Sequence, residues 1–234
     1  MHSGPRTARF HFFGRLTDLA PAPHTSYSFN GQPSLKDAIE AQGVPHVEAG
    51  ALLVNGLPAL ANQLLQPGDL VEVHPDESPF PEARFVLDVH LGRLARALRL
   101  LGFDTRYRND YDDPELAEVS EAEDRALLTR DIGLLKHGRV RRGYWLRSQH
   151  TEEQLQEVLQ RYGLLAQIQP FSRCLLCNGP IGPVAEAAVQ HLLPPRVRGF
   201  QTEYFQCANC GKVYWKGTHY TRMLEFIERV TRKE

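Results

Sequence analysis

The fold prediction starts from one stretch of the sequence, Arg84-Phe-Val-Leu-Asp-Val-His-Leu-Gly-Arg-Leu-Ala-Arg-Ala-Leu-Arg-Leu-Leu-Gly-Phe-Asp104. Its first part, residues 85–87, is a short apolar run that is typical of a buried parallel strand. Asp88 follows directly, at the carboxyl end of the predicted strand. Ligands of open α/β sheets bind outside the carboxyl ends of strands, so Asp88 is a candidate site residue. Aspartate is also a favoured helix N-cap, and this stretch alone fits both interpretations.

The second part of the stretch predicts an amphipathic helix. Apolar side chains recur at helical spacing, and arginines occupy roughly the opposite arc. The apolar side comprises Leu91, Leu94, Ala95, Leu98 and Leu101, and the basic side comprises Arg93, Arg96 and Arg99. We therefore expect one face to pack against a sheet and the other face to be basic.

The composition of the whole chain is that of a globular protein with an uneven charge distribution. The 234 residues are 42% hydrophobic and carry a net charge of −1. No apolar run approaches the roughly 18 to 20 residues of a membrane span, and we expect a cytoplasmic protein without a membrane partner. Residues 110–124 hold eight acids and no Lys or Arg, whereas residues 125–147 hold seven bases and one acid. An acidic segment therefore precedes a basic one.

Residues 8–74 predict a small β-rich unit. Strands are expected at residues 8–13, 27–29, 52–54 and 70–73, and a short helix is expected after Ser34. Asn55-Gly56 predicts a tight hairpin turn. This order, with Val-Asn-Gly and Pro-Gly-Asp-Leu-Val-Glu-Val near its end, resembles the ubiquitin-like β-grasp family, including its small sulfur carriers.

The small sulfur carriers act through a flexible Gly-Gly C-terminus, and the end of this β-rich unit contains no Gly-Gly. The last strand continues through Pro75, Pro79 and Pro81 into further protein, so we do not transfer the carrier chemistry. A docking or stabilising module for an as yet unknown protein partner is the stronger interpretation. The prolines mark a linker between two cores, and residues from about Pro81 onward are expected to fold without the first unit.

Strands and helices alternate after residue 104, which favours a three-layer α/β domain with a parallel sheet. A strand is expected at residues 105–107, and Asp113 is expected to cap a helix that starts at Pro114. Residues 126–129 form the next apolar run, followed by Arg130 and Asp131. A second aspartate thus ends a predicted strand.

All four cysteines of the chain occur in two Cys-x-x-Cys pairs, which are Cys174 with Cys177 and Cys207 with Cys210. Four thiolates complete the tetrahedron that a structural Zn²⁺ ion prefers. Two disulfides or a redox pair are the alternatives, but a cytoplasmic chain disfavours disulfides and neither pair begins a helix in a thioredoxin-like context. The spacing therefore predicts a structural zinc site.

Residues 211–222, after the last cysteine, alternate aromatic and basic side chains. Such a pattern can stack on unpaired nucleotides and neutralise phosphates. Alternatively, Tyr214 and Trp215 pack the ribbon against the body, and His219 caps the last helix. The residues fit both interpretations.

Carboxylates at strand ends predict a second metal site of a different kind. Asp88 and Asp131 end two strands, and the loop beyond a third strand holds Asp110, Asp112 and Asp113. Converging carboxylates repel one another unless a cation joins them. Oxygen ligands suit Mg²⁺ or Mn²⁺, which can activate a water and stabilise the charge that develops on a phosphodiester.

Several motifs together resemble the PIN-like ribonuclease family. They are Phe-Val-Leu-Asp88, Leu-Leu-Thr-Arg-Asp131, Arg-Cys-Leu-Leu-Cys-Asn178 and Tyr-Trp-Lys-Gly-Thr-His-Tyr220. The group that they resemble most is the C-terminal domain of mutator-type exoribonucleases, which carries a zinc ribbon. The resemblance implies a metal-dependent ribonuclease with catalytic carboxylates at Asp88 and Asp131. The usual PIN pattern adds a helix-borne Glu and a fourth acid. Several acids could take their places here, from Asp110 to Asp113, of which Asp110 and Asp113 are the candidates, and from Glu115 to Asp124.

The resulting hypothesis has three domains. Residues 1–79 form the β-grasp domain, residues 80–168 the PIN-like nuclease domain, and residues 169–234 the zinc ribbon with a C-terminal helix. Arg93, Arg96 and Arg130 are expected to hold phosphates of single-stranded RNA. The competing hypothesis is a non-catalytic RNA-binding or ribosome-associated adaptor that uses the ribbon and the basic stretch.

Overall fold

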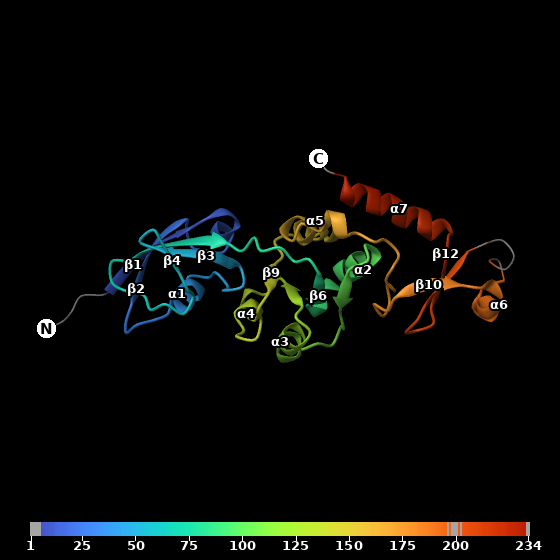
Figure 1. Ribbon diagram of the computed structural model, residues 1–234, viewed down its shortest axis with the longest axis horizontal. Coiled ribbons are helices and arrows are strands. Elements are labelled where there is room, and N and C mark those ends of the chain that lie inside the picture. The colour runs from blue at the N-terminus through green and yellow to red at the C-terminus, as the bar shows by residue number, and fades with distance from the viewer. Residues whose placement is uncertain (1–5, 196, 198–200, 202, 233–234) are drawn as a thin grey trace. The chain divides into compact units, whose positions relative to one another are not determined.

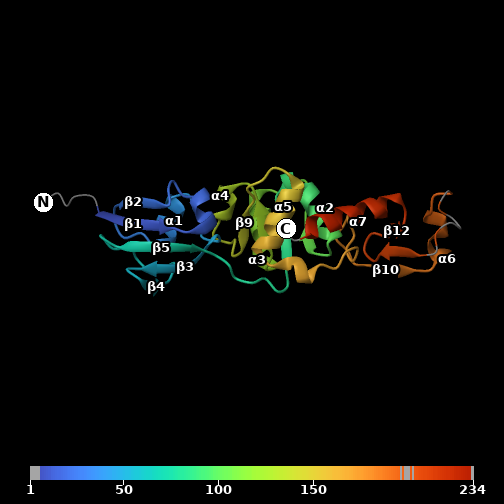
Figure 2. The same cartoon turned by 90° about the horizontal axis from the view of Figure 1, so that it is seen from above.

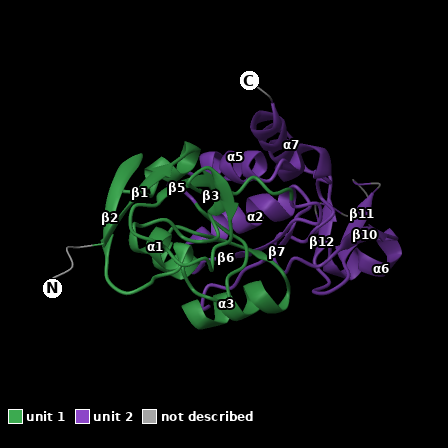
Figure 3. Cartoon of the chain, turned by 60° about the vertical axis from the view of Figure 1, so that its left-hand side comes forward, with its two compact units in different colours: residues 1–79, 112–145 green, residues 80–111, 146–234 purple. Residues whose placement is uncertain are grey.

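The computed structural model describes residues 6–195, 197, 201 and 203–232. The chain divides into two compact units, one made of residues 1–79 and 112–145 and the other of residues 80–111 and 146–234 (Figure 3). Each unit thus combines two segments that are separate in the sequence.

A five-stranded β-grasp sheet forms the first part of unit 1. Its strands are β1 (Arg6–Phe12), β2 (His24–Phe29), β3 (Ala49–Val54), β4 (Leu57–Ala59) and β5 (Leu70–Pro75), joined by η1 (Gly14–Asp18) and α1 (Leu35–Ala41) (Figure 1). The strand order is β2-β1-β5-β3-β4, and Figure 2 shows the strands side by side in this order. The first and last strands, β1 and β5, run parallel, while the other pairs are antiparallel. This is the predicted β-grasp arrangement.

Local sequence signals explain how this sheet is built. Alternate residues of β1 and β5, such as Phe10 and Val71, are almost completely buried in one core with α1. Ser34 and Asp37 form a capping box at the start of α1. Asn55 and Gly56 both have positive φ, of 52° and 79°, as the tight turn between β3 and β4 requires.

The second part of unit 1 consists of α3 (Asp113–Ala122), β8 (Ala126–Thr129), α4 (Ile132–Leu135) and β9 (Gly143–Trp145). Strands β8 and β9 pair in parallel, and all four residues of β8 are buried. The expected N-cap of α3 was wrong by one residue. Asp112 caps the helix because its carboxylate accepts from the Glu115 N–H at 2.8 Å, while Glu115 accepts from the Asp112 N–H at 3.1 Å.

Unit 1 holds its two parts together through buried polar contacts. Glu48 is fully buried, and its carboxylate accepts a hydrogen bond from the Trp145 backbone N–H at 2.7 Å. The Lys136 ammonium donates to the Glu40 carbonyl at 2.7 Å, and His46 Nε2 donates to the Val140 carbonyl at 3.0 Å. The β-grasp sheet is therefore bound directly to the segment that ends at residue 145.

Unit 2 begins with β6 (Arg84–Leu87), η2 (Val89–Leu91), α2 (Gly92–Leu100) and β7 (Asp104–Arg106), and continues with α5 (Thr151–Arg161) and η3 (Leu164–Gln167). Strands β6 and β7 pair in parallel. The central sheet has the order β7-β6-β8-β9, so the predicted parallel α/β sheet is confirmed. Helix α2 packs against β7 and α5 through buried side chains such as Leu94 and Leu98.

A three-stranded antiparallel sheet in the order β10-β11-β12 forms the C-terminal part of unit 2. Its elements are β10 (Ile181–Val184), α6 (Glu186–Val189), η4 (Gln190–Leu192), β11 (Tyr204–Cys207), β12 (Val213–Trp215) and α7 (Thr218–Thr231). Helix α7 contacts α5, where the Arg229 guanidinium pairs with both Glu152 oxygens at 2.7 and 3.0 Å. Among the described residues, no helix is long and apolar enough to cross a membrane.

Candidate metal and ribonuclease site

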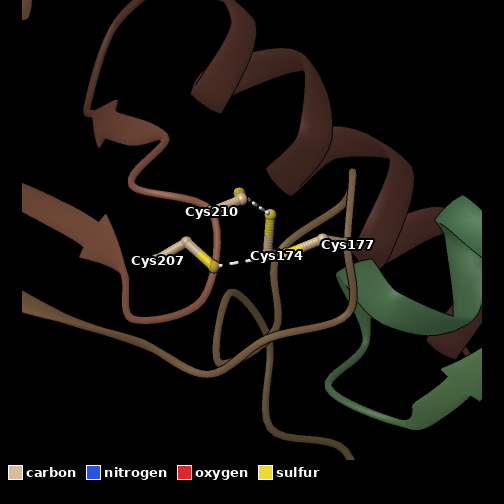
Figure 4. A group of neighbouring side chains, drawn as sticks. All are labelled: Cys174, Cys177, Cys207 and Cys210. Carbon is tan, nitrogen blue, oxygen red and sulfur yellow. Dashed lines mark hydrogen bonds between the residues drawn. The ribbon is translucent and has the colours of Figure 1, made fainter.

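The four cysteines converge at one point of the ribbon, and their side chains point toward one another (Figure 4). Cys174 Sγ lies 3.6 Å from Cys210 Sγ, and Cys177 Sγ lies 3.4 Å from Cys207 Sγ. A disulfide needs a separation of about 2.05 Å, and all four cysteines are free thiols. Zn–S bonds of about 2.3 Å give a tetrahedron whose edges are about 3.8 Å, close to these separations. The donor set fits a structural zinc ion.

Two similar turns present these thiols. The Asn178 N–H donates to the Cys174 carbonyl at 2.9 Å, and the Gly211 N–H donates to the Cys207 carbonyl at 3.0 Å. Asn178 and Gly211 each follow the second cysteine of their pair and have φ of 69° and 71°. Glycine and asparagine adopt this left-handed conformation most readily, so the residue after each Cys-x-x-Cys is part of the motif.

The surroundings of Cys174 and Cys177 shift the pKa values of these two thiols in opposite directions. Burial raises the pKa of Cys174, but hydrogen bonds from the Tyr214 hydroxyl and the local backbone outweigh burial and bring that pKa to about 6. Burial raises the pKa of Cys177 to about 12. The thiolate is the form that binds zinc, so metal binding would release the protons that the thiols still carry.

Asp88 and Asp131 both cap short helical segments at the carboxyl ends of strands. Asp88 follows β6, is half-buried, and accepts from the His90 N–H at 3.4 Å. Asp131 follows β8, is exposed, and its Oδ1 accepts from the Gly133 and Leu134 N–H groups at 2.6 and 3.3 Å. In the described part of the chain, no hydrogen bond engages Asp131 Oδ2. That oxygen can bind a cation while Oδ1 caps the helix.

The two other candidate acids have different surroundings. Asp110 is exposed and pairs with the Arg108 guanidinium through two contacts of 2.9 Å. The hydrogen bond from Arg108 holds the pKa of the Asp110 carboxyl below its ordinary value. Asp113 is the first residue of α3 and is exposed. Asp88 and Asp110 belong to unit 2, whereas Asp113 and Asp131 belong to unit 1, so the structure divides the four acids between the units.

A polar cavity of about 890 Å³ lies within unit 2, beside the residues that follow Asp88. Arg93 and Arg96 are exposed on α2 and line this cavity, and Arg99 and Arg108 line it as well. Arg93 and Arg96 form no ion pair with any described residue. They are available for an anionic ligand. The third predicted phosphate ligand, Arg130, is exposed after β8 in unit 1.

Arg99 does not belong to an exposed basic face, so that part of the helix prediction was wrong. Only 4% of the residue is exposed, and it donates to the Thr105 carbonyl at 3.0 Å and to the Leu175 and Leu176 carbonyls at 3.3 and 3.0 Å. Burial lowers the pKa of Arg99 from its ordinary value. Arg99 therefore connects α2 and β7 to the first cysteine turn.

A family model described as the Mut7-C RNAse domain matches residues 83–227, well over half of the chain. The chain belongs to the Mut7-C RNAse domain family. A second model, described as Mut7-C ubiquitin, matches residues 6–80. The resemblance inferred from the motifs is thereby confirmed, and the family implies an RNA substrate. No curated protein matches the chain.

Two solved structures are each similar to 30% of this chain. SAMP1 from Haloferax volcanii is 18% identical over 30% of this chain and 94% of its own length, with a TM-score of 0.26. A putative molybdopterin converting factor, subunit 1, from Pyrococcus furiosus is 19% identical over 30% of this chain and 95% of its own, also with a TM-score of 0.26. The β-grasp assignment rests on the strand order described above.

Sequence reasoning missed two residues of this Mut7-C protein that hold the site's elements in place. Glu48 binds the Trp145 N–H, and the Trp145 indole donates to the Arg130 carbonyl at 3.2 Å, next to Asp131. Arg99 binds the first cysteine turn. Arg99 lies in the stretch that predicts the amphipathic helix, but no local signal indicates the role of either residue, because Trp145 is far from Glu48 in the sequence and the cysteine turn is far from Arg99.

Proposed function

We propose that the protein is a metal-dependent ribonuclease that hydrolyses single-stranded RNA. The arginine-lined cavity beside Asp88 is the observation that carries this proposal, together with membership of the Mut7-C RNAse family. Arg93 and Arg96 would bind phosphates of the strand, because both side chains are exposed and lack acidic partners. Arg130 would bind a further phosphate next to Asp131.

The proposed catalytic carboxylates are Asp88 and Asp131, with Asp110 or Asp113 completing the ligand set. In support, Asp88 follows β6 and Asp131 follows β8. Each of these strands pairs in parallel with a neighbour, and ligands of α/β sheets bind at the carboxyl ends of such strands. Asp131 Oδ2 is a hard oxygen donor in an exposed position, which suits Mg²⁺ or Mn²⁺. Such an ion, when bound, would supply an activated water and offset the charge of the phosphodiester.

A cleavage assay tests this proposal. The full-length protein with its zinc is incubated with end-labelled single-stranded RNA while Mg²⁺ or Mn²⁺ is titrated. We expect cleavage that depends on the added ion, and product lengths that distinguish endonucleolytic from exonucleolytic action. Arg96→Ala is expected to raise KM more than it lowers kcat, since it removes a phosphate contact. RNA left intact at every ion concentration would contradict the proposal.

The alternative is a non-catalytic RNA-binding adaptor. The Asp110–Arg108 pair favours it, because an acid that is neutralised within its own loop is a weaker metal ligand. The same assay separates the two functions, since an adaptor would retain RNA binding but show no cleavage with either ion.

A further inference from the structure

We propose that a second cavity of unit 2, lined by the ribbon and the first turn of α7, binds one unpaired base of the RNA. This inference rests on the proposed ribonuclease function, because it takes RNA as the ligand. The cavity has a volume of about 330 Å³, which is small for a ligand site, since such sites span roughly 300–1,000 Å³. None of the four cysteines lines it, and Leu175 is the lining residue that it shares with the arginine-lined cavity.

Aromatic rings dominate the lining of this base pocket. They come from the segment before the ribbon, from β11, from β12 and from α7, and they are Phe171, Phe205, Tyr214, Trp215 and Tyr220. All five residues are partly exposed. Partly exposed rings present π-faces to a ligand, and every nucleobase has a π-face that can stack on them. The pattern at residues 211–222 therefore contributes both to packing and to an open aromatic surface.

The backbone of Phe171, one of the lining residues, has an unfavourable conformation. Its φ is 62°, in the left-handed region that bulky residues rarely adopt. A backbone hydrogen bond from the Phe171 N–H to the Leu100 carbonyl, at 3.0 Å, holds this conformation. The ring contacts that of Tyr220, with centroids 4.7 Å apart and planes at 33°. Strained residues of this kind concentrate at ligand sites.

Charge argues for a nucleic acid as the occupant. Arg173 and Lys216 line the base pocket, and among the described lining residues of both cavities there is no acidic side chain. Leu175 lines both cavities, so the base pocket adjoins the arginine-lined cavity beside Asp88. A single strand could place phosphates on Arg93 and Arg96 and a splayed base among the aromatic rings.

Tyr220 offers a matched pair of test variants. Tyr220→Ala removes the ring, whereas Tyr220→Phe keeps it. Within the described part of the chain, the Tyr220 hydroxyl makes no hydrogen bond to a cysteine, whereas the Tyr214 hydroxyl contacts Cys174 Sγ. Binding is measured by fluorescence anisotropy with a labelled oligouridylate, in the full-length Asp131→Asn background and without added Mg²⁺ or Mn²⁺. Tyr220→Ala should weaken binding by about ten-fold or more, the loss expected for one stacked base, and Tyr220→Phe should bind as the parent does.

Phe171→Gly provides a second, independent variant. Glycine adopts positive φ without strain, so we expect the thermal unfolding temperature to be maintained while binding of the oligouridylate weakens. An abasic oligonucleotide of equal length separates the contribution of the bases from that of the phosphates. All the variants should bind it equally, because the phosphate contacts are unchanged.

Three outcomes decide the inference. The base pocket would be overturned if Tyr220→Ala and Phe171→Gly bound oligouridylate with full affinity. The ribonuclease proposal would still stand if the protein that retains Asp131 cleaved RNA. Parent protein that binds abasic and base-containing strands equally well would overturn the base pocket too. If the parent bound no RNA at all, the base pocket and the proposed function would both be rejected.

Discussion

Asp88 and Asp131 combine two roles that the sequence could not separate. Each caps a short helical segment, and each follows a strand at the end where ligands of an α/β sheet bind. Asparagine caps about as well as aspartate but carries no charge. Replacement by asparagine therefore distinguishes capping from cation binding.

We expect Asp88→Asn and Asp131→Asn each to lower metal-dependent RNA cleavage by about a hundred-fold or more, the cost of losing one electrostatic contact in the transition state. Stability should change little, because both caps are kept. The double variant should be only slightly worse than either single variant, since ligands of one ion act as a unit. Asp112→Asn is the control, because Asp112 caps α3 and is outside the proposed ligand set. Normal cleavage by Asp131→Asn would remove it from the catalytic role.

Arg99 and Arg96 are three residues apart on α2, but their replacement by alanine should affect the free energy of unfolding very differently. Arg99→Ala leaves the Thr105, Leu175 and Leu176 carbonyls without their donor, and we expect it to lower the free energy of unfolding by about 2–4 kcal/mol. Arg96→Ala should change stability by less than about 0.5 kcal/mol, because Arg96 is exposed. Urea unfolding of both variants measures this, and equal stability would show that the Arg99 contacts contribute little.

At the scale of elements, the ribbon depends on its four thiols. The β10-β11-β12 sheet has a small core, with Val189, Leu193 and Tyr204 buried, so we expect a bound metal to contribute much of its folding free energy. The purified chain should therefore contain one tightly bound zinc ion.

Cys174→Ser should lose this zinc ion and unfold the ribbon at a lower temperature than the rest of the chain. Leu176→Ser is the matched control, since Leu176 lies in the same turn but is 62% exposed and contributes no ligand. Elemental analysis and circular dichroism provide the measurements. Zinc retained at one equivalent in Cys174→Ser would contradict the four-thiolate site.

Elements set by local signals could be predicted from the sequence, whereas those set by distant partners could not. The Asn55-Gly56 turn and the Cys-x-x-Cys turns depend on a few adjacent residues, so spacing alone identified them. The cap of α3 was predicted at Asp113 because Pro114 was expected to be the first residue of the helix. Glu115, three residues after Asp112, completes a capping box and is the signal that decides between them.

At the scale of the whole molecule, Glu48 links the β-grasp sheet to β9. Glu48→Ala deprives the Trp145 N–H and the Arg15 guanidinium of a buried acceptor, and we expect a loss of about 2–3 kcal/mol in unfolding free energy. Glu77→Ala, an exposed change on the same domain, should lie within about 0.5 kcal/mol of the parent. Chemical denaturation compares the two.

The same contacts change the expectation for a chain that starts at Pro81. The linker prolines predicted that this fragment folds independently, but it lacks Glu48, Glu40 and His46, which bind residues 136–145. We expect the fragment to unfold at a lower temperature than the full chain, as scanning calorimetry would measure. An unchanged unfolding temperature would show that the β-grasp domain is dispensable for stability.

The discontinuity of unit 1 has a consequence for biosynthesis. Translation proceeds at about 5–20 residues per second from the N-terminus, so the β-grasp core can form while residues 112–145 are still inside the ribosome. Until the Trp145 amide emerges, Glu48 Oε1 lacks this donor, whereas Oε2 can already pair with Arg15. The nascent β-grasp domain thus offers a preformed surface on which the later segment assembles, and the stretch around Asp131 completes its folding against a template made earlier in the same chain.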